Sequence, residues 1–101
     1  MKTNIEVDLK GIRVYVLTEA QQDLKTMGFN ITGAYVYGSR VEAEAVVDKD
    51  IAHYEKSYGK EYVTATSEPG YYKVVTLDIP DSPLGAFTAK IYYKIAETYL
   101  H

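Results

Sequence analysis

The residues best placed to do chemistry lie in one short stretch near the middle of the chain. The dipeptide Gly38-Ser39 ends an apolar run, and Asp48 and Asp50 follow within a dozen residues. A glycine turn can hold a phosphate group, and carboxylate oxygens are the ligands that Mg²⁺ prefers. The same residues also suit a tight hairpin turn followed by a helix start, because Gly favours two-residue loops and Asp is a common N-cap.

The order strand, Gly-Ser-Arg and Asp-x-Asp resembles the core of the minimal nucleotidyltransferases. The strand and its glycine turn would be AYVYGSR (34–40). If Asp50 were the first residue of the metal-binding Asp-x-Asp pair, the position of the second Asp would be occupied by Ala52. The resemblance implies a turn that grips a triphosphate and carboxylates that hold Mg²⁺. The nucleotide-binding residues that it implies are Gly38, Ser39, Asp48, Asp50 and Asp78.

Composition limits the classes of function. The chain has 101 residues, which predicts one domain over residues 1–101, and its net charge is −3. The 11 Lys and Arg residues are scattered, so we expect no double-stranded nucleic acid as a ligand, since neutralised phosphates supply most of such affinity. Cys is absent, and neither a signal peptide nor a membrane span is indicated. We therefore expect a cytoplasmic protein without membrane contact, resident metal or cofactor.

Hydrophobic alternation and turn signals predict three successive strand-strand-helix units. The first unit has strands at 4–9 and 12–17 and a helix from Thr18 to Gly28, where Gln21 completes a capping box. The predicted elements of the other two units are strands at 29–37 and 40–47 with a helix at 51–58, then strands at 60–67 and 71–79 with a helix at 84–99.

Two alternatives stay open at this point. Residues 40–47 include Glu-Ala-Glu-Ala, which has good helix propensity, so this segment could instead join the helix that follows it. Residues 86–100 alternate like a strand, but we favour a helix that Ser82 caps, because a strand of that length would be unusual. Pro69 and Gly70 predict a type II turn between the last two strands.

The expected fold is α+β, a small single domain with a mainly antiparallel sheet and helices packed on one face. The opposite face would then be left to water or to a partner. The chain contains 11 Tyr, and Tyr and Arg are the residues enriched at the energetic centres of protein interfaces. The residues that we expect to bind a partner are Arg13, Tyr15, Tyr35, Tyr37, Glu42, Glu44 and Tyr62.

The function we expect is that of a small intracellular binding module without catalysis, acting through protein–protein contacts. Inhibitors of larger host proteins, encoded by phages and other mobile elements, are proteins of this type. No nucleophile, base and oxyanion group assemble in the sequence, so we expect no catalytic residue. Two other functions stay open: an active or degenerate nucleotidyltransferase-like protein that binds nucleotide with Mg²⁺, and a homo-oligomeric structural or accessory subunit.

Overall fold

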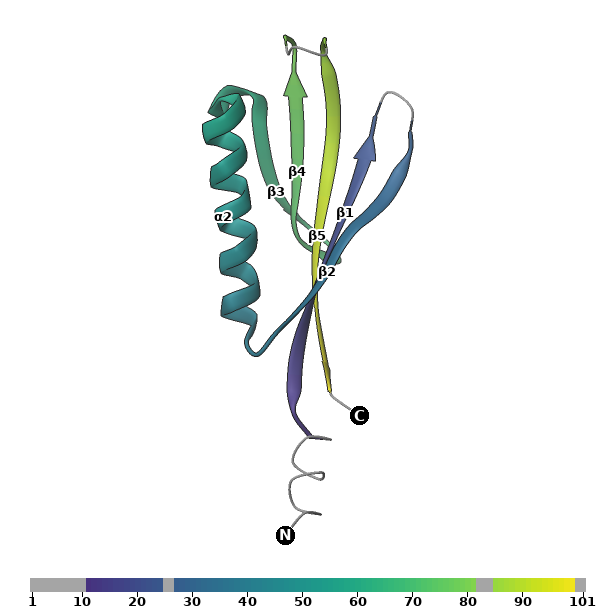
Figure 1. Ribbon diagram of the computed structural model, residues 1–101, viewed down its shortest axis with the longest axis vertical. Coiled ribbons are helices and arrows are strands. Elements are labelled where there is room, and N and C mark those ends of the chain that lie inside the picture. The colour runs from purple at the N-terminus through teal and green to yellow at the C-terminus, as the bar shows by residue number, and fades with distance from the viewer. Residues whose placement is uncertain (1–10, 25–26, 82–84, 100–101) are drawn as a thin grey trace.

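The computed structural model describes residues 11–24, 27–81 and 85–99, and these form one antiparallel sheet with one long helix (Figure 1). The strands are β1 (Arg13–Asp23), β2 (Phe29–Tyr37), β3 (Val63–Glu68), β4 (Tyr71–Ile79) and β5 (Phe87–Tyr99). The helix is α2 (Arg40–Tyr58), and a short 3₁₀ turn, η1 (Lys60–Tyr62), follows it. The strand order is β2-β1-β5-β4-β3, so β5 lies in the centre and β2 and β3 form the edges.

The prediction of three strand-strand-helix units is wrong, because the described residues contain one α-helix and five strands. Thr18–Asp23, the predicted start of the first helix, continues β1. There Thr18 pairs with Ala34 of β2 on one side and with Lys94 of β5 on the other. A capping box contributes only about 1 kcal/mol, and hydrogen-bonded pairing on both sides outweighs it. The predicted strand at 4–9 lies outside the described residues.

The predicted C-terminal helix is also wrong, and the strand alternative is confirmed. β5 runs for 13 residues and pairs with β1 over Ala89–Tyr99 and with β4 over Phe87–Tyr93. Ala89, Ile91 and Tyr93 are buried on one side of it, as the alternation predicts. The strand exceeds the usual length because two neighbours support it. The predicted cap at Ser82 lies outside the described residues.

The segment 40–47 belongs to α2, so the helix alternative is confirmed and the hairpin at Gly38-Ser39 is wrong. The Ser39 side chain caps the helix, and its Oγ accepts a hydrogen bond from the backbone N–H of Glu42 at 3.2 Å. Ala43 and Val47 lie four residues apart on one side of the helix and are fully buried. This apolar side covers one face of the sheet, where it packs against residues such as Leu17 and Val75.

The β3–β4 hairpin is confirmed, except that Lys60–Tyr62, the predicted start of its first strand, form η1. Glu68 pairs with Tyr71 across Pro69-Gly70, and Gly70 has φ 85°. The third residue of a type II turn needs such a positive φ, which Gly adopts without steric cost. The mainly antiparallel sheet is likewise confirmed, and in the described part of the chain one α-helix packs on one face where three were expected.

Candidate functional site

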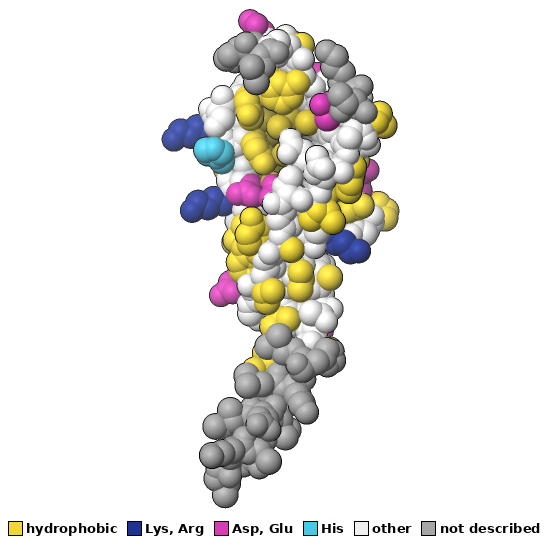
Figure 2. All heavy atoms as spheres, turned by 45° about the vertical axis from the view of Figure 1, so that its right-hand side comes forward, with side chains coloured by type: hydrophobic (Ala, Val, Ile, Leu, Met, Phe, Trp, Pro, Cys, Tyr) yellow, Lys and Arg dark blue, Asp and Glu magenta, His cyan; other side chains and the backbone are white. Residues whose placement is uncertain are grey.

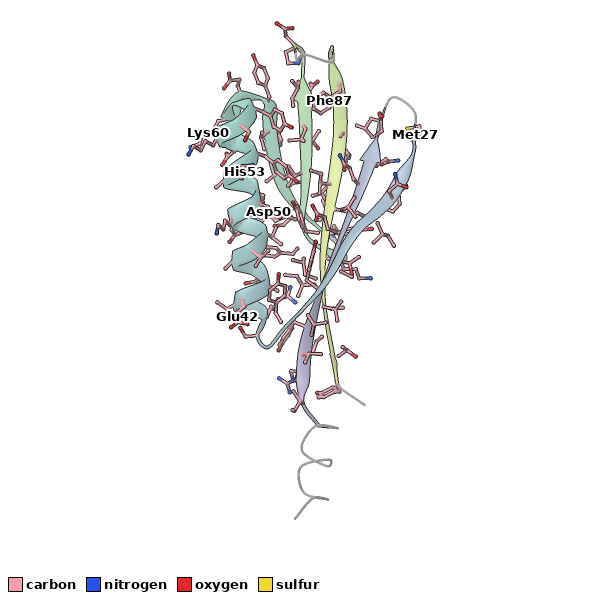
Figure 3. The ribbon with its side chains drawn as sticks, viewed as in Figure 1. Met27, Glu42, Asp50, His53, Lys60 and Phe87 are labelled. Carbon is pink, nitrogen blue, oxygen red and sulfur yellow. The ribbon has the colours of Figure 1, made fainter. Side chains whose placement is uncertain are left out.

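The residues implied in nucleotide binding do not meet in the structure. Ser39 begins α2, and Asp50 lies 11 residues further along it, about 16 Å away at the rise of an α-helix. Figure 3 shows Asp50 in the middle of the helix and Glu42 close to the helix start. Nucleotide binding stays a prediction that no contact between these residues supports.

Asp78 lies on the opposite side of the sheet from α2. Its neighbours in β4, Leu77 and Ile79, are buried in the core beneath the helix, so Asp78 points the other way. There its Oδ1 accepts a hydrogen bond from the Thr88 hydroxyl at 3.3 Å. In the described residues no group of three His, Cys, Asp or Glu side chains could hold a metal ion.

Several of the residues predicted to bind a partner are neighbours on the helix side of β1 and β2, where Tyr15 pairs with Tyr37. Tyr15, Tyr37 and Tyr62 pack against the core on the helix side of the sheet. Tyr15 shares this side with Leu17, which is only 2% exposed. Sequence alternation could not identify the covered face, because β1 is apolar on both sides. The helix identifies it, since α2 packs on Leu17 and not on its neighbour Val16.

The four other predicted residues lie on β1, β2 and α2. Arg13 forms an ion pair with Glu97 at 2.9 Å near the ends of β1 and β5. Glu44 accepts from the Arg40 guanidinium at 3.0 Å on the helix surface, and Glu42 lies in the first turn of the same helix. Tyr35 of β2 is exposed. Their role in partner binding stays a prediction.

The structure instead brings a different set of residues together on the side of the sheet away from α2, which we call the open face. Strand pairing defines it, because Val16, Thr18 and Ala20 of β1 alternate with the covered Leu17 and lie beside matching residues of β2 and β5. The open face consists of Val16, Thr18, Ala20, Phe29, Ile31, Ala34, Val36, Tyr71, Lys90, Tyr92 and Lys94.

Three aromatic rings from three strands meet at the centre of the open face. The Tyr92 ring lies 5.8 Å from that of Phe29 and 5.2 Å from that of Tyr71, with interplanar angles of 51° and 52°. The Tyr92 hydroxyl donates to Gln22 Oε1 at 3.1 Å, which fixes the central ring. Beside the rings a groove of about 150 Å³ is lined by Thr18, Ala20 and Ile31 among others.

A register irregularity brings Tyr71 into this cluster. The β3–β4 pairing shifts between Thr66 and Glu68, and one extra residue in a strand reverses the side to which the following residues point. Tyr71 therefore contacts Tyr92 on the open face, whereas Tyr72 reaches Asp48 of α2. The sequence contained no signal for this shift, and the aromatic cluster was missed for that reason.

The open face is more apolar than a surface that only meets water. Ile31 is 70% exposed, Val36 62% and Phe29 54%. β2 lies at the right of Figure 1. Figure 2 turns that side toward the viewer and shows hydrophobic side chains at the surface, in a view that also takes in the histidine of α2 at its left. Contiguous exposed apolar surface of this kind is typical of interaction sites.

Charge is distributed unevenly between the two sides of the sheet. Lys90 and Lys94 flank Tyr92 on the open face, because residues two apart in a strand point the same way. On the helix side lie the carboxylates of Glu19, Glu42, Glu44, Asp48 and Asp50, together with the basic residues of α2, Arg40, Lys49 and Lys56. Asp78 lies on the side away from α2, so the basic part of the open face is the surface next to Tyr92.

A second cluster of polar groups lies between the helix and the sheet. The Tyr93 hydroxyl lies 3.4 Å from Asp50 Oδ2 and 3.5 Å from the Tyr54 hydroxyl. Burial raises the pKa of Tyr93 far above its ordinary value, so its hydroxyl keeps its proton. Burial, and then the negative charge of Asp50, raise the pKa of the Glu19 carboxyl.

We interpret this second cluster as structural, because each group has a partner from another element. The Tyr93 side chain is fully buried, so no substrate reaches its ring. The hydroxyl of this central strand residue instead connects β5 to α2 through Asp50 and Tyr54. Burying a hydroxyl without a hydrogen-bond partner would lower the stability of the fold by up to several kcal/mol. The Tyr93 hydroxyl has such partners and avoids this cost.

No helix among the described residues is long and apolar enough to cross a membrane. Comparison with known proteins finds no matching family model, no similar curated protein and no similar solved structure.

Proposed function

We propose that this protein is a small non-catalytic binding module, acting inside the cell, that docks its open face onto another protein. The observation that supports the proposal is the cluster of Phe29, Tyr71 and Tyr92, which lies on an apolar sheet face that no described element covers. Large aromatic side chains centred in an apolar patch are typical of the energetic centre of a protein interface.

The charges on the open face indicate what kind of partner fits it. The ammonium groups of Lys90 and Lys94 lie on either side of Tyr92 along β5. A partner with an apolar centre and acidic groups around it would satisfy both features, because complementary charges steer encounter and exclude wrong partners. Occlusion of a site on a larger protein, as by an inhibitor from a phage or another mobile element, is one way such a module would act.

Single-stranded nucleic acid fits the open face less well. Bases bind to sheets by stacking on separate aromatic platforms within a positively charged groove. Here the three rings are tilted against one another by about 50° and pack together, so they form a ridge and not a row of platforms. Two lysines on a chain of net charge −3 supply little of the phosphate attraction such binding needs.

The proposal is tested with a variant of the open face and a matched variant of the helix side. Tyr71→Ser with Lys94→Glu removes one ring and reverses one charge on the open face. Tyr58→Ser with Lys56→Glu makes the same changes on α2. Both proteins are immobilised and used to capture partners from a cell lysate, after their melting temperatures are shown to match that of the unchanged protein.

We expect the open-face variant to lose the captured protein and the helix-side variant to keep it. Capture should also weaken with salt, because part of the attraction is between exposed charges. Equal capture by both variants would contradict the proposal. Binding of labelled single-stranded RNA or DNA, lost only in the open-face variant, would replace the protein partner by a nucleic acid.

A further inference from the structure

The edge strand β2 lacks most features that keep sheet edges apart. Its sequence, FNITGAYVY, contains neither a charged residue nor a proline. Natural edge strands are usually short, or carry Lys, Pro or inward-pointing charges, because unpaired backbone N–H and C=O groups would otherwise pair with another chain. β2 has nine residues. Eight of them pair with β1, and among the described strands none pairs with the other side of β2.

The other edge of the sheet is protected in the usual way. β3 has six residues, ends at Glu68 and is followed by Pro69. Its length leaves little backbone to pair, and its charged end and the proline oppose a further strand. The two edges of the same sheet therefore differ, and the contrast points to β2 as the edge that another strand can extend.

One irregularity limits how much of β2 can pair. The register against β1 shifts between Glu19 and Ala20, which leaves Thr32 as an extra residue in β2. A bulge interrupts regular pairing, so the regular part of the edge is the five-residue segment Gly33–Tyr37.

We propose that this protein self-associates by antiparallel pairing of Gly33–Tyr37 with the same segment of a second copy. An antiparallel pair of identical strands has a two-fold axis, as in most homodimers. Residues that lie opposite each other in the joined sheet point to the same side. The two open faces therefore share one side only when an open-face residue of one copy pairs with an open-face residue of the other. Full overlap of the five residues then places Tyr35 on the axis and Ala34 opposite Val36 of the second copy.

A second copy fits this edge better than an unrelated strand for two reasons. The segment is uncharged, so two copies approach there without like-charge repulsion despite the net charge of −3. Pairing also covers part of Tyr35, which is 49% exposed, and of Val36. Five residue pairs bury less than the roughly 800 Å² per partner of a standard interface, so we expect a weak dimer.

The dimer would extend the proposed function without depending on it. Ten strands would form one sheet, with two aromatic clusters on the same side. A partner with two docking sites would bind such a pair more tightly than a single copy, because the second contact becomes intramolecular. Edge pairing and open-face docking share Ala34 and Val36, but the variants that test them change other residues: Tyr35 for the edge, and Tyr71 with Lys94 for the open face.

The absence of Cys from the chain allows a direct test with single cysteines in the full-length protein. Tyr35→Cys places one thiol on the expected axis, where facing Cβ atoms would lie about 5 Å apart. We expect mild oxidation to give a covalent dimer at micromolar concentration. Thr64→Cys on the protected edge β3 is the control and should stay monomeric under the same conditions.

Register and face are tested with two further measurements. A mixture of Ala34→Cys and Val36→Cys proteins should cross-link to each other faster than either does alone, since these positions face one another. In sedimentation equilibrium of the uncross-linked protein, Tyr35→Lys should weaken self-association at least tenfold, whereas Thr64→Lys should not.

Three results would overturn the proposal. One is a monomer at all concentrations up to the millimolar range. Another is equal cross-linking at positions 35 and 64. A third is a dimer that survives Tyr35→Lys but is lost on Tyr71→Ser with Lys94→Glu, which would show assembly through the open face. Partner capture that persists in a monomeric Tyr35→Lys protein would leave the proposed function intact.

Discussion

The hydroxyl of Tyr72 lies 2.9 Å from Oδ1 of Asp48, and this hydrogen bond connects the sheet to the helix across 24 residues of sequence. It exists because the irregular pairing of β3 and β4 turns Tyr72 toward α2 and Tyr71 toward the open face. One irregularity in the hairpin therefore serves both the packing of the helix and the aromatic cluster of the proposed docking surface.

This contact predicts a loss of stability in alkali. Burial, and then the hydrogen bond to the Asp48 carboxylate, raise the pKa of Tyr72 to about 12. An unfolded Tyr titrates near pH 10, so between about pH 10 and pH 12 the unfolded state releases a proton that the folded state keeps. The stability that is present below pH 10 is therefore lost as the pH rises through this range.

The measurement is the free energy of unfolding by urea at several values between pH 8 and pH 11.5. Tyr72→Phe should show a shallower decline above pH 10 than the unchanged protein. Some decline should remain, because the pKa values of Tyr93 and Tyr54 are raised as well. Parallel curves for the two proteins would contradict this prediction.

A second prediction concerns Glu19, whose pKa is raised by burial and then by the charge of Asp50. The charged form is disfavoured in the folded state, so at neutral pH this carboxylate costs stability. Glu19→Gln should raise the free energy of unfolding at pH 7 by roughly 0.5 kcal/mol, the usual size for a partly exposed charge pair.

The sign of the pH dependence checks the cause. The unchanged protein should gain stability relative to Glu19→Gln as the pH falls toward the unfolded value near 4.5, because its folded state takes up a proton first. Denaturant unfolding at pH 7 and pH 5 measures the difference. A destabilised Glu19→Gln at both values would mean that the carboxylate makes a needed contact.

Ser39 gives a third prediction, which separates a helix cap from a phosphate-binding turn. Ser39→Ala removes the acceptor for the Glu42 N–H and should lower stability by about 1 kcal/mol, as for other N-caps. Ser57→Ala, near the exposed end of the same helix, is the control and should change stability by less than about 0.5 kcal/mol.

The same proteins test the nucleotide alternative. Nucleoside triphosphate with Mg²⁺, present at a hundred times its Kd, would add about 2.7 kcal/mol of stability. We expect no rise in the melting temperature of the unchanged protein with any of the four triphosphates. A clear rise that Ser39→Ala or Asp50→Ala abolishes would revive the resemblance to the minimal nucleotidyltransferases.

Local signals in the sequence predicted the parts of the fold that local interactions determine. The turn at Pro69-Gly70 and the strands beside it are confirmed, apart from residues 60–62, because Gly70 adopts the positive φ of a type II turn without any long-range partner. Gly38-Ser39 also suits a two-residue hairpin turn, and Ser is at the same time a common N-cap. The sequence around Ser39 is therefore compatible with both a hairpin turn and a helix N-cap.

Long-range pairing decided the remaining elements. The segment from Thr18 has a good helix cap in its sequence, but β2 and β5 hold it in a strand from both sides. The open face depends on the strand order and on two register shifts. None of these leaves a local pattern, so Phe29, Tyr71 and Tyr92 could not be grouped from the sequence.

The last prediction concerns Gly33, which lies beneath the ring of Tyr35 on the edge strand. A Cβ at position 33 would lie 2.6 to 2.9 Å from three atoms of that ring, closer than side chains approach. Gly33→Ala should therefore displace the Tyr35 ring. Because the ring is partly exposed and free to rotate away, we expect the cost to stay below about 1 kcal/mol.

A double-mutant cycle identifies this contact as the cause. Gly33→Ala should cost stability when Tyr35 is present and should be neutral or stabilising with Tyr35→Ala, where alanine no longer meets the ring and Gly no longer adds backbone entropy to the unfolded state. Urea unfolding of the four proteins measures the coupling. Additive changes would mean that the backbone at Gly33, and not the ring above it, resists a side chain.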